Sequence, residues 1–149
     1  MLIRPFVPTD SAAVVALWQA CGLTRPWNDP LRDIARKQAV QPELFLVGES
    51  AQQLVASVMA GYDGHRGWVN YLAVHPDNRR QGLGEALMRH VEQELLARGC
   101  PKLNLQVRSG NTAVLDFYRA LGYLQDDVVS LGKRLIPDAP PPPVRSEEH

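Results

Sequence analysis

The residues best suited to chemistry lie at 79–85, where an apolar run ends and an amphipathic segment begins. This stretch reads RRQGLGE and follows the β-forming run at 68–74. The first N–H groups of a helix lack internal partners and lie at the positive end of its dipole, so a glycine loop that enters a helix can bind an anion. Gly82 and Gly84 lack a Cβ and allow close approach to the backbone, while Arg79 and Arg80 add positive charge. The stretch therefore predicts a phosphate-binding loop.

Two common phosphate-binding loops do not fit this sequence. A dinucleotide fingerprint needs a third glycine at the position where Leu87 stands. A nucleotide P-loop needs a lysine and a hydroxyl residue after its last glycine, but Glu85 and Ala86 follow Gly84. An ordinary strand-to-helix turn that merely needs two glycines is the remaining structural alternative.

A second candidate group lies downstream, in the stretch 104–123 that reads NLQVRSGNTAVLDFYRALGY. Asn111 stands at the break between a predicted strand and a predicted helix. Tyr118 follows seven residues later, so it lies two turns further along the same helix face. A tyrosine in this place can donate a proton, or it can simply belong to the core-facing side of an amphipathic helix.

Two loops carry further candidates for contacts with a substrate. The loop RPWNDP holds Trp27, Asn28 and Asp29, and the glycine-rich loop GYDGHRG holds Asp63 and His65. Structural roles fit the same residues equally well. Asn28 or Asp29 could cap the next helix and Trp27 could hold its loop in place, while Asp63 and His65 could stabilise a turn.

Composition narrows the class of protein. The chain has 16 basic and 16 acidic residues among 149, and this zero net charge argues against a broad nucleic-acid-binding surface. Two widely spaced cysteines, Cys21 and Cys100, indicate a reduced intracellular protein. The four histidines have no metal-ligand spacing, so we expect no metal. No signal peptide and no long apolar run is present, so we expect a cytoplasmic protein without membrane association.

Hydrophobic periodicity predicts one mixed α/β domain at 1–136. Six or seven strands are expected at 1–7, 44–49, 54–60, 68–74, 102–107 and 124–135. The last of these ranges holds either one strand or a hairpin. About four flanking helices are expected at 10–21, 31–39, 83–98 and 112–121. The strands before and after the third helix can pair in parallel through a right-handed crossover. The proline-rich remainder, 137–149, predicts a disordered tail.

The two motif regions together resemble one enzyme superfamily. Arg79-x-x-Gly82-x-Gly84 is similar to the [QR]-x-x-G-x-[GA] pyrophosphate loop of the GNAT N-acetyltransferases, and the preceding LAVHP resembles their strand and turn. Asn111, Tyr118 and the closing Leu-Gly-Tyr resemble the downstream segment of the same family. The loops RPWNDP and GYDGHRG further resemble the YpeA-type bacterial acetyltransferases, and that likeness spans most of the domain.

The resemblance implies a GNAT fold, acetyl-CoA as donor and an amine as acceptor. It implies that the backbone of Leu72, Ala73 and Val74 pairs with the pantetheine arm, and that Asn111 contacts the far end of that arm. It places the pyrophosphate on the loop residues Arg79, Arg80, Gln81, Gly82, Leu83, Gly84 and Glu85. It makes Tyr118 the general acid and the Val74 N–H the donor to the oxyanion. The loop containing Trp27, Asn28 and Asp29 would cover the acceptor pocket.

The general base and the acceptor stay open at this stage. Family members that acetylate a ribosomal protein carry a glutamate where this chain has Gln106, and glutamine cannot accept a proton at neutral pH. Candidates for the base are a water chain or one of Asp29, Glu49, Asp63 and His65. The acceptor amine belongs to a small molecule or to a protein. A homodimer through an exposed strand edge is a further open question.

Two alternative functions belong to other classes. A non-catalytic module that binds acyl-CoA would keep the loop without the chemistry, and the missing carboxylate at Gln106 favours it while Tyr118 argues against it. A nucleic-acid-binding protein would use Arg79, Arg80 and Arg108. The zero net charge and the lack of interleaved aromatic residues argue against that alternative.

Overall fold

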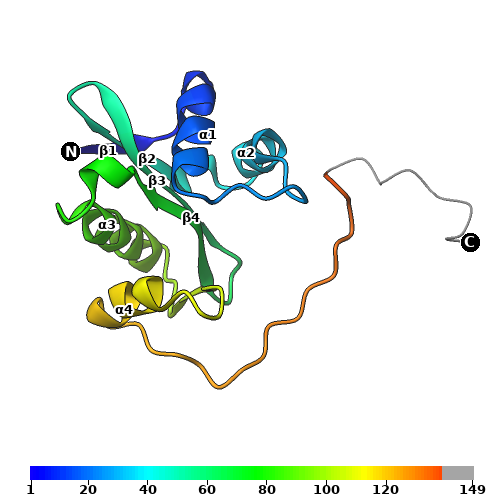
Figure 1. The fold of residues 1–149 in the computed structure, drawn as a ribbon. Coiled ribbons are helices and arrows are strands. Elements are labelled where there is room, and N and C mark those ends of the chain that lie inside the picture. Colours follow the sequence, from blue (N-terminus) through cyan, green and yellow to red (C-terminus); the bar gives the residue numbers. More distant parts are fainter. Residues whose placement is uncertain (139–149) are drawn as a thin grey trace, which may run out of the picture.

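The computed structural model describes residues 1–138 and shows one five-stranded sheet with helices on both faces (Figure 1). The strands lie side by side in chain order and are β1 (Leu2–Pro5), β2 (Phe45–Ser50), β3 (Gln53–Tyr62), β4 (Gly67–Val74) and β5 (Leu103–Leu105). The first four strands are antiparallel, and β4 and β5 are parallel. The helices are α1 (Ser11–Ala20), α2 (Pro30–Gln38), α3 (Leu83–Ala97) and α4 (Thr112–Ala120). Three short 3₁₀ turns complete the set, at Pro8–Asp10, Pro42–Leu44 and Pro76–Asn78.

The two faces of the sheet bury separate apolar clusters. Figure 1 shows α1 and α2 on one face and α3 and α4 on the other. Trp18 of α1 and Ile34 of α2 pack on Phe45, Val47 and Met59. The other cluster joins α3 to the opposite face through Leu87, Met88, Val91 and Leu95. This division follows from the alternation of side chains along the strands, which gives each face its own apolar set.

The helix α3 is the connection between the parallel strands, as the sequence predicts. Its buried side chains recur at helical spacing, at Leu87, Val91 and Leu95. Its end is marked by Gly99, which has a left-handed φ of 80°. The strands β4 and β5 are joined by this helix in a βαβ unit, so the predicted parallel pair and the mixed α/β sheet are confirmed.

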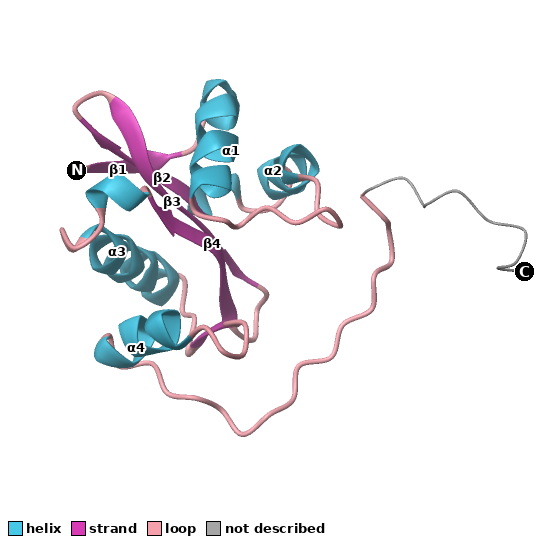
Figure 2. Ribbon diagram, in the orientation of Figure 1, coloured by secondary structure: helices cyan, strands magenta, loops and turns pink. Residues whose placement is uncertain are grey.

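The strand or hairpin predicted within 124–135 is wrong. Figure 2 shows the chain after α4 as an extended loop, and the described sheet has five strands rather than six or seven. Its apolar side chains stay exposed, among them Val128, Val129 and Leu131. The alternation there is typical of a strand, but a strand also needs a hydrogen-bonding partner. The neighbouring β5 is only three residues long, so it offers a short edge.

The described chain ends against α2. The side chain of Asp138 is fully buried, accepts hydrogen bonds from both terminal nitrogens of Arg36, and accepts a third from the Asp29 N–H at 2.9 Å. Only residues 137 and 138 of the predicted tail lie within the described range. The four consecutive prolines fall outside the described residues.

Candidate functional site

The site begins where β4 separates from β5. These strands pair only from Gly67 to Val69, opposite Leu103 to Leu105. In the pairing of β4 with β3, Asn70 lies opposite Met59 and Ala73 opposite Ser57, so β4 carries one extra residue. Tyr71, within this β-bulge, has a left-handed φ of 53°. A bulge bends and twists its strand, and here it coincides with the point where the two parallel strands part.

Beyond the bulge, one edge of β4 has no strand partner. Val74 and Ala73 pair with β3 on one side, at Ala56 and Ser57. On the other side, no strand of residues 1–138 pairs with 70–74. The backbone N–H and C=O groups that face this side can therefore pair with an extended ligand, as an edge strand pairs with an added strand.

The bulge is fixed from the face covered by α1 and α2. The ring of Tyr71 stacks on Trp18 with 3.9 Å between centroids, and its hydroxyl donates to Asp33 at 2.6 Å. Trp18 in turn donates through its indole N–H to the Ser57 hydroxyl at 3.0 Å. Burial, with the neighbouring Asp33 carboxylate, raises the pKa of Tyr71. The bulge residue is thus held by both helices of that face.

The predicted anion loop enters α3 with free backbone amides. Arg80 and Gly82 both adopt left-handed backbones, with φ of 63° and 75°. The first helical hydrogen bond runs from the Ala86 N–H to the Gly82 carbonyl at 3.0 Å. The N–H groups of 83–85 therefore lie before the helical ladder begins. The side chains of Arg79, Arg80 and Gln81 are exposed beside them.

The two glycines of this loop have different roles. Gly82 has open space around it, and its left-handed φ explains the residue type. Gly84 lies inside the first turn of α3, and a Cβ there would lie 3.1 Å from Cζ of Phe117 and 3.7 Å from Cγ2 of Val74. The sequence interpretation that Gly84 admits an anion is therefore incomplete, because this glycine lets α3 pack closely on α4.

Tyr118 lies on the buried side of α4. Its side chain is 8% exposed and packs edge-on against Phe117 and Tyr123, with centroids 5.0 and 5.6 Å away. Burial raises the pKa of Tyr118 to about 12. None of residues 1–138 accepts a hydrogen bond from its hydroxyl. Tyr118 lines a groove of about 1200 Å³ between β5, α4 and the segment 124–131.

Other predicted donor-site residues make structural contacts. The Asn111 side chain caps α4 by accepting from the Val114 N–H at 3.4 Å. Arg79 donates from Nε to the Val74 carbonyl at 3.3 Å, which ties the loop to the end of β4. The Arg79 bond joins the loop to the end of β4, and the closeness of Gly84 to Phe117 and Val74 places α4 in the same region.

The predicted acceptor residues fall into two places. Trp27 is 51% exposed and lies under the Arg108 guanidinium, 5.9 Å from its ring centre. Asn28 accepts a hydrogen bond from Arg134, and Asp29 caps α2 by accepting from the N–H groups of 31 and 32. Asp29 thus caps α2, which is the structural alternative that the sequence offered for this residue.

The second place is the turn between β3 and β4. Asp63 accepts from the N–H groups of His65 and Arg66 at 2.8 and 2.7 Å, and from the Trp68 indole at 3.4 Å. The two backbone bonds lower the pKa of Asp63. The carboxylate is engaged in its own turn, and the His65 side chain is exposed beside it.

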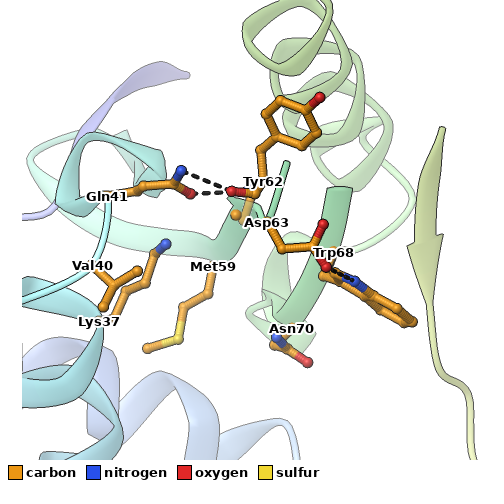
Figure 3. A pocket seen from close by; sticks show the side chains of 10 residues that line it. Lys37, Val40, Gln41, Met59, Tyr62, Asp63, Trp68 and Asn70 are labelled. Atoms are coloured by element: carbon orange, nitrogen blue, oxygen red, sulfur yellow. Dashed lines mark hydrogen bonds between the residues drawn. The ribbon is translucent and has the colours of Figure 1, made fainter. Parts of the chain in front are cut away.

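The structure also reveals a pocket that the sequence did not indicate. It has a volume of about 240 Å³ and lies between the end of α2 and the strands β3 and β4 (Figure 3). Its wall includes Lys37, Gln41, Met59, Trp68 and Asn70. One signal was available in the sequence, because Lys37 follows the apolar Ile34 at i+3 and so falls on the inward face of the helix.

A mixed sheet that opens beside a helix N-terminus, with a buried tyrosine nearby, is the arrangement that the GNAT resemblance implied. Residues 12–123 match the model of the Acetyltransferase (GNAT) family. The chain belongs to this family, and the resemblance inferred from its motifs is confirmed.

Relatives and solved structures agree with this assignment. An acetyltransferase of Sodalis glossinidius (strain morsitans) is 54% identical over 139 residues, covering 93% of this chain and 98% of that protein. The crystal structure of Ard1 from Thermoplasma volcanium is 27% identical with a TM-score of 0.72, covering 83% of this chain and 82% of that one. The ribosomal-protein-S18-alanine N-acetyltransferase from Escherichia coli is 27% identical with a TM-score of 0.69, covering 81% and 76%.

Residues 1–138 lack a membrane-spanning helix and a cluster of metal-ligating side chains. None of their helices is long and apolar enough to cross a membrane. Within the same 138 residues, no three His, Cys, Asp or Glu side chains are grouped to hold a metal ion.

Proposed function

We propose that the protein transfers an acetyl group from acetyl-CoA to a primary amine of a small molecule or a protein. The observation that carries this proposal is the free edge of β4 next to the free amides of α3. An extended pantetheine arm can pair with the backbone of Leu72, Ala73 and Val74 as an added strand would. The pyrophosphate can accept hydrogen bonds from the amides of 80–85 at the positive end of the α3 dipole.

The proposed chemistry is direct attack within a complex of both substrates. The neutral amine forms a C–N bond at the thioester carbonyl, and the Val74 N–H stabilises the resulting oxyanion. The C–S bond then breaks, and the departing thiolate takes a proton from the Tyr118 hydroxyl. The high pKa of Tyr118 keeps its hydroxyl protonated at neutral pH, ready to donate. The proton lost by the amine leaves to a base or to water, and the tyrosine is reprotonated from solvent.

The proposed base is water rather than a carboxylate at position 106, just after β5. Gln106 is exposed and donates its amide to the Ser130 hydroxyl, so no carboxylate occupies that position. Asp63 is engaged by three donors in its own turn, and Asp29 is a helix cap. An amine that reaches the site uncharged needs little help to lose its proton after attack.

Thermal unfolding in the presence of acetyl-CoA, CoA or NAD tests the donor site. A ligand that binds only the native state raises its stability by about 2.7 kcal/mol at a hundredfold excess over the dissociation constant. We expect stabilisation by acetyl-CoA and by CoA and none by NAD. Equal melting temperatures in all samples at millimolar ligand would contradict the donor assignment.

A non-catalytic module that binds acyl-CoA is the second candidate, and the amide at Gln106 favours it. The two candidates differ in turnover. Release of CoA thiol that depends on an added amine, together with a product heavier by one acetyl group, would support the enzyme. Tight binding of acetyl-CoA without thiol release from any amine would support the module.

A further inference from the structure

The pocket of Figure 3 contains a lysine that has no ion-pair or hydrogen-bond partner among residues 1–138. Lys37 lies on the inward side of α2, three residues after the buried Ile34, at a place where amphipathic helices carry apolar residues. Its side chain is partly buried. Its ammonium makes no hydrogen bond or ion pair with any of residues 1–138. Burial lowers the pKa of Lys37, as expected for a charge removed from water without a counterion.

Neighbouring charges do not neutralise this lysine. Glu43, the acidic residue that acts on Lys37 through space, lies 3.7 Å from Arg98 in an ion pair. Asp63 lies at the other side of the pocket, where its two oxygens accept from two backbone N–H groups and the Trp68 indole (Figure 3). The positive charge of Lys37 is therefore available to a ligand.

The rest of the pocket is shaped for a compact group. A Cβ at Gly61 would lie 3.6 Å from the Lys37 ammonium, so the missing side chain leaves this end of the pocket open. Gln41 is fixed by two hydrogen bonds to the backbone of Tyr62, at 2.8 and 2.9 Å. Met59 supplies an apolar wall. A single cation in a small, partly apolar pocket suits a carboxylate on an aliphatic chain.

The pocket and the groove lined by Tyr118 share one residue. Trp68 lines both the pocket and the groove that contains Tyr118. Asn70, two residues along β4, also lines the pocket, and the free edge at Val74 is four residues further on. Because β4 carries one extra residue in its bulge, this stretch spans only the three β3 steps from Met59 to Ala56. At about 3.3 Å per step, the pocket lies roughly 10 Å from the proposed site of acetyl transfer.

We propose that this pocket binds a carboxylate of the acceptor through Lys37, so that the enzyme prefers amines that carry a carboxylate about 10 Å from the nitrogen. This inference rests on the proposed N-acetyltransferase function and adds its acceptor class. In this proposal Lys37 selects acceptors by the position of their carboxylate, and acetyl transfer takes place in the groove lined by Tyr118.

Matched acceptors test the preference. The pair 8-aminooctanoate and 8-aminooctanamide differs only in the charge at the far end, and 4-aminobutanoate is too short to reach the pocket. The peptide amides Ala-Gly-Glu and Ala-Gly-Gln repeat the comparison for a protein-like acceptor. One charge-assisted hydrogen bond gives an expected preference of about ten- to a hundredfold in kcat/KM for the acid. The effect should appear mainly in KM.

Two substitutions of Lys37 separate charge from shape. Lys37→Met should reduce the acid-to-amide ratio to about one, and Lys37→Glu should reverse it. Lys133→Met, which removes an exposed lysine that lines neither cavity, should keep the wild-type ratio. Thermal stabilisation by CoA confirms that each variant is folded. A wild-type ratio of one, or a ratio that Lys37→Met leaves unchanged, would overturn the inference.

A binding measurement keeps this test independent of catalysis. Calorimetric titration of N-acetyl-8-aminooctanoate into the CoA complex should show binding that Lys37→Met weakens about tenfold or more. If no amine were acetylated, the proposed function would fail, yet binding that depends on Lys37 would still support the carboxylate site. Acetylation of amines without any binding dependence on Lys37 would leave the function intact and remove the carboxylate site.

Discussion

The hydroxyl of Tyr71 donates a 2.6 Å hydrogen bond to Asp33, and this bond connects α2 to the only residue of β4 with a left-handed backbone. The same ring stacks on Trp18 of α1. Two helices therefore hold the bulge at which β4 leaves β5. Because the bulge precedes the free edge at Leu72–Val74, the packing of one face of the sheet fixes the backbone of the edge at which we propose that the pantetheine arm binds.

Replacing Tyr71 by Phe tests this relationship. The stacking on Trp18 is retained, but the bond to a charged, partly buried acceptor is lost. We expect the free energy of unfolding to fall by about 1.5–3 kcal/mol in urea titrations. The affinity for acetyl-CoA should fall as well, because the edge is no longer held. Tyr62→Phe is the matched control, since that hydroxyl makes only an exposed 3.3 Å bond to a backbone carbonyl. Equal stability of the two variants would contradict this role of Tyr71.

The contact of Gly84 with Phe117 gives a second prediction. Gly84→Ala places a methyl group 3.1 Å from the Phe117 ring, so we expect a loss of about 1–3 kcal/mol from overpacking. Phe117→Leu should relieve part of that loss, and a double-mutant cycle measures the coupling. In Gly82→Ala the cost of about 1 kcal/mol comes from the left-handed backbone, so Phe117→Leu should not relieve it. Additive effects at Gly84 and Phe117 would exclude this contact as the cause.

The sequence was most informative where structure is local. The run at 68–74, the glycine loop and the helix at 83–98 each have a pattern that depends on near neighbours, and all three are present in the structure. The motif at Arg79 and Gly82 indicated the family for the same reason. Cap residues are equally local, and Asp29 and Asn111 both cap helices.

The features that the sequence did not predict depend on distant contacts. The bulge at Tyr71 is held by residues 38 and more positions away, and nothing near it in the chain indicates a left-handed backbone. Asp138 lies beside prolines in the predicted disordered tail, but its side chain is buried against Arg36. The segment 124–135 has the alternation of a strand without a partner in the described sheet. A periodic pattern in the sequence does not specify which distant residues pair or pack together in the folded chain.

The burial of Asp138 predicts a pH dependence of stability. Hydrogen bonds from Arg36 lower the pKa of Asp138 from its ordinary value of 3.8 to about 2. A group with a lowered folded-state pKa stabilises the protein above its unfolded pKa and loses that contribution as the pH falls through the folded pKa. Asp138→Asn should therefore be less stable than the wild type at pH 7. The difference should shrink between about pH 4 and pH 2, where the wild-type carboxylate takes up its proton.

Unfolding of both proteins by urea from pH 7 down to pH 2 measures this difference. Asp77→Asn is a suitable control, because that side chain is 88% exposed beside His75. Its stability should follow the wild type throughout. A difference for Asp138→Asn that is constant over the acid range would show that charge on Asp138 is not the cause.

Substitutions of Tyr118 and of Tyr123 distinguish a role in catalysis from a role in stability. Their rings are in edge contact, but Tyr123 donates to Glu92 while the Tyr118 hydroxyl has no acceptor within residues 1–138. Tyr118→Phe should lower kcat by roughly ten- to ten-thousandfold with little change in unfolding. Tyr123→Phe should instead lower stability by about 1–3 kcal/mol and keep its turnover.

The pH profile of kcat adds a second readout for Tyr118. Burial raises the pKa of this phenol to about 12, so it stays protonated across the range in which an acceptor amine loses its proton. Wild-type kcat should rise as the bound amine is deprotonated and then stay level up to about pH 10, without a decline from loss of the acid. Tyr118→Phe should follow the same profile at a lower rate. Unchanged turnover in Tyr118→Phe would remove this tyrosine from the mechanism, and the thiolate would then leave by taking its proton from water.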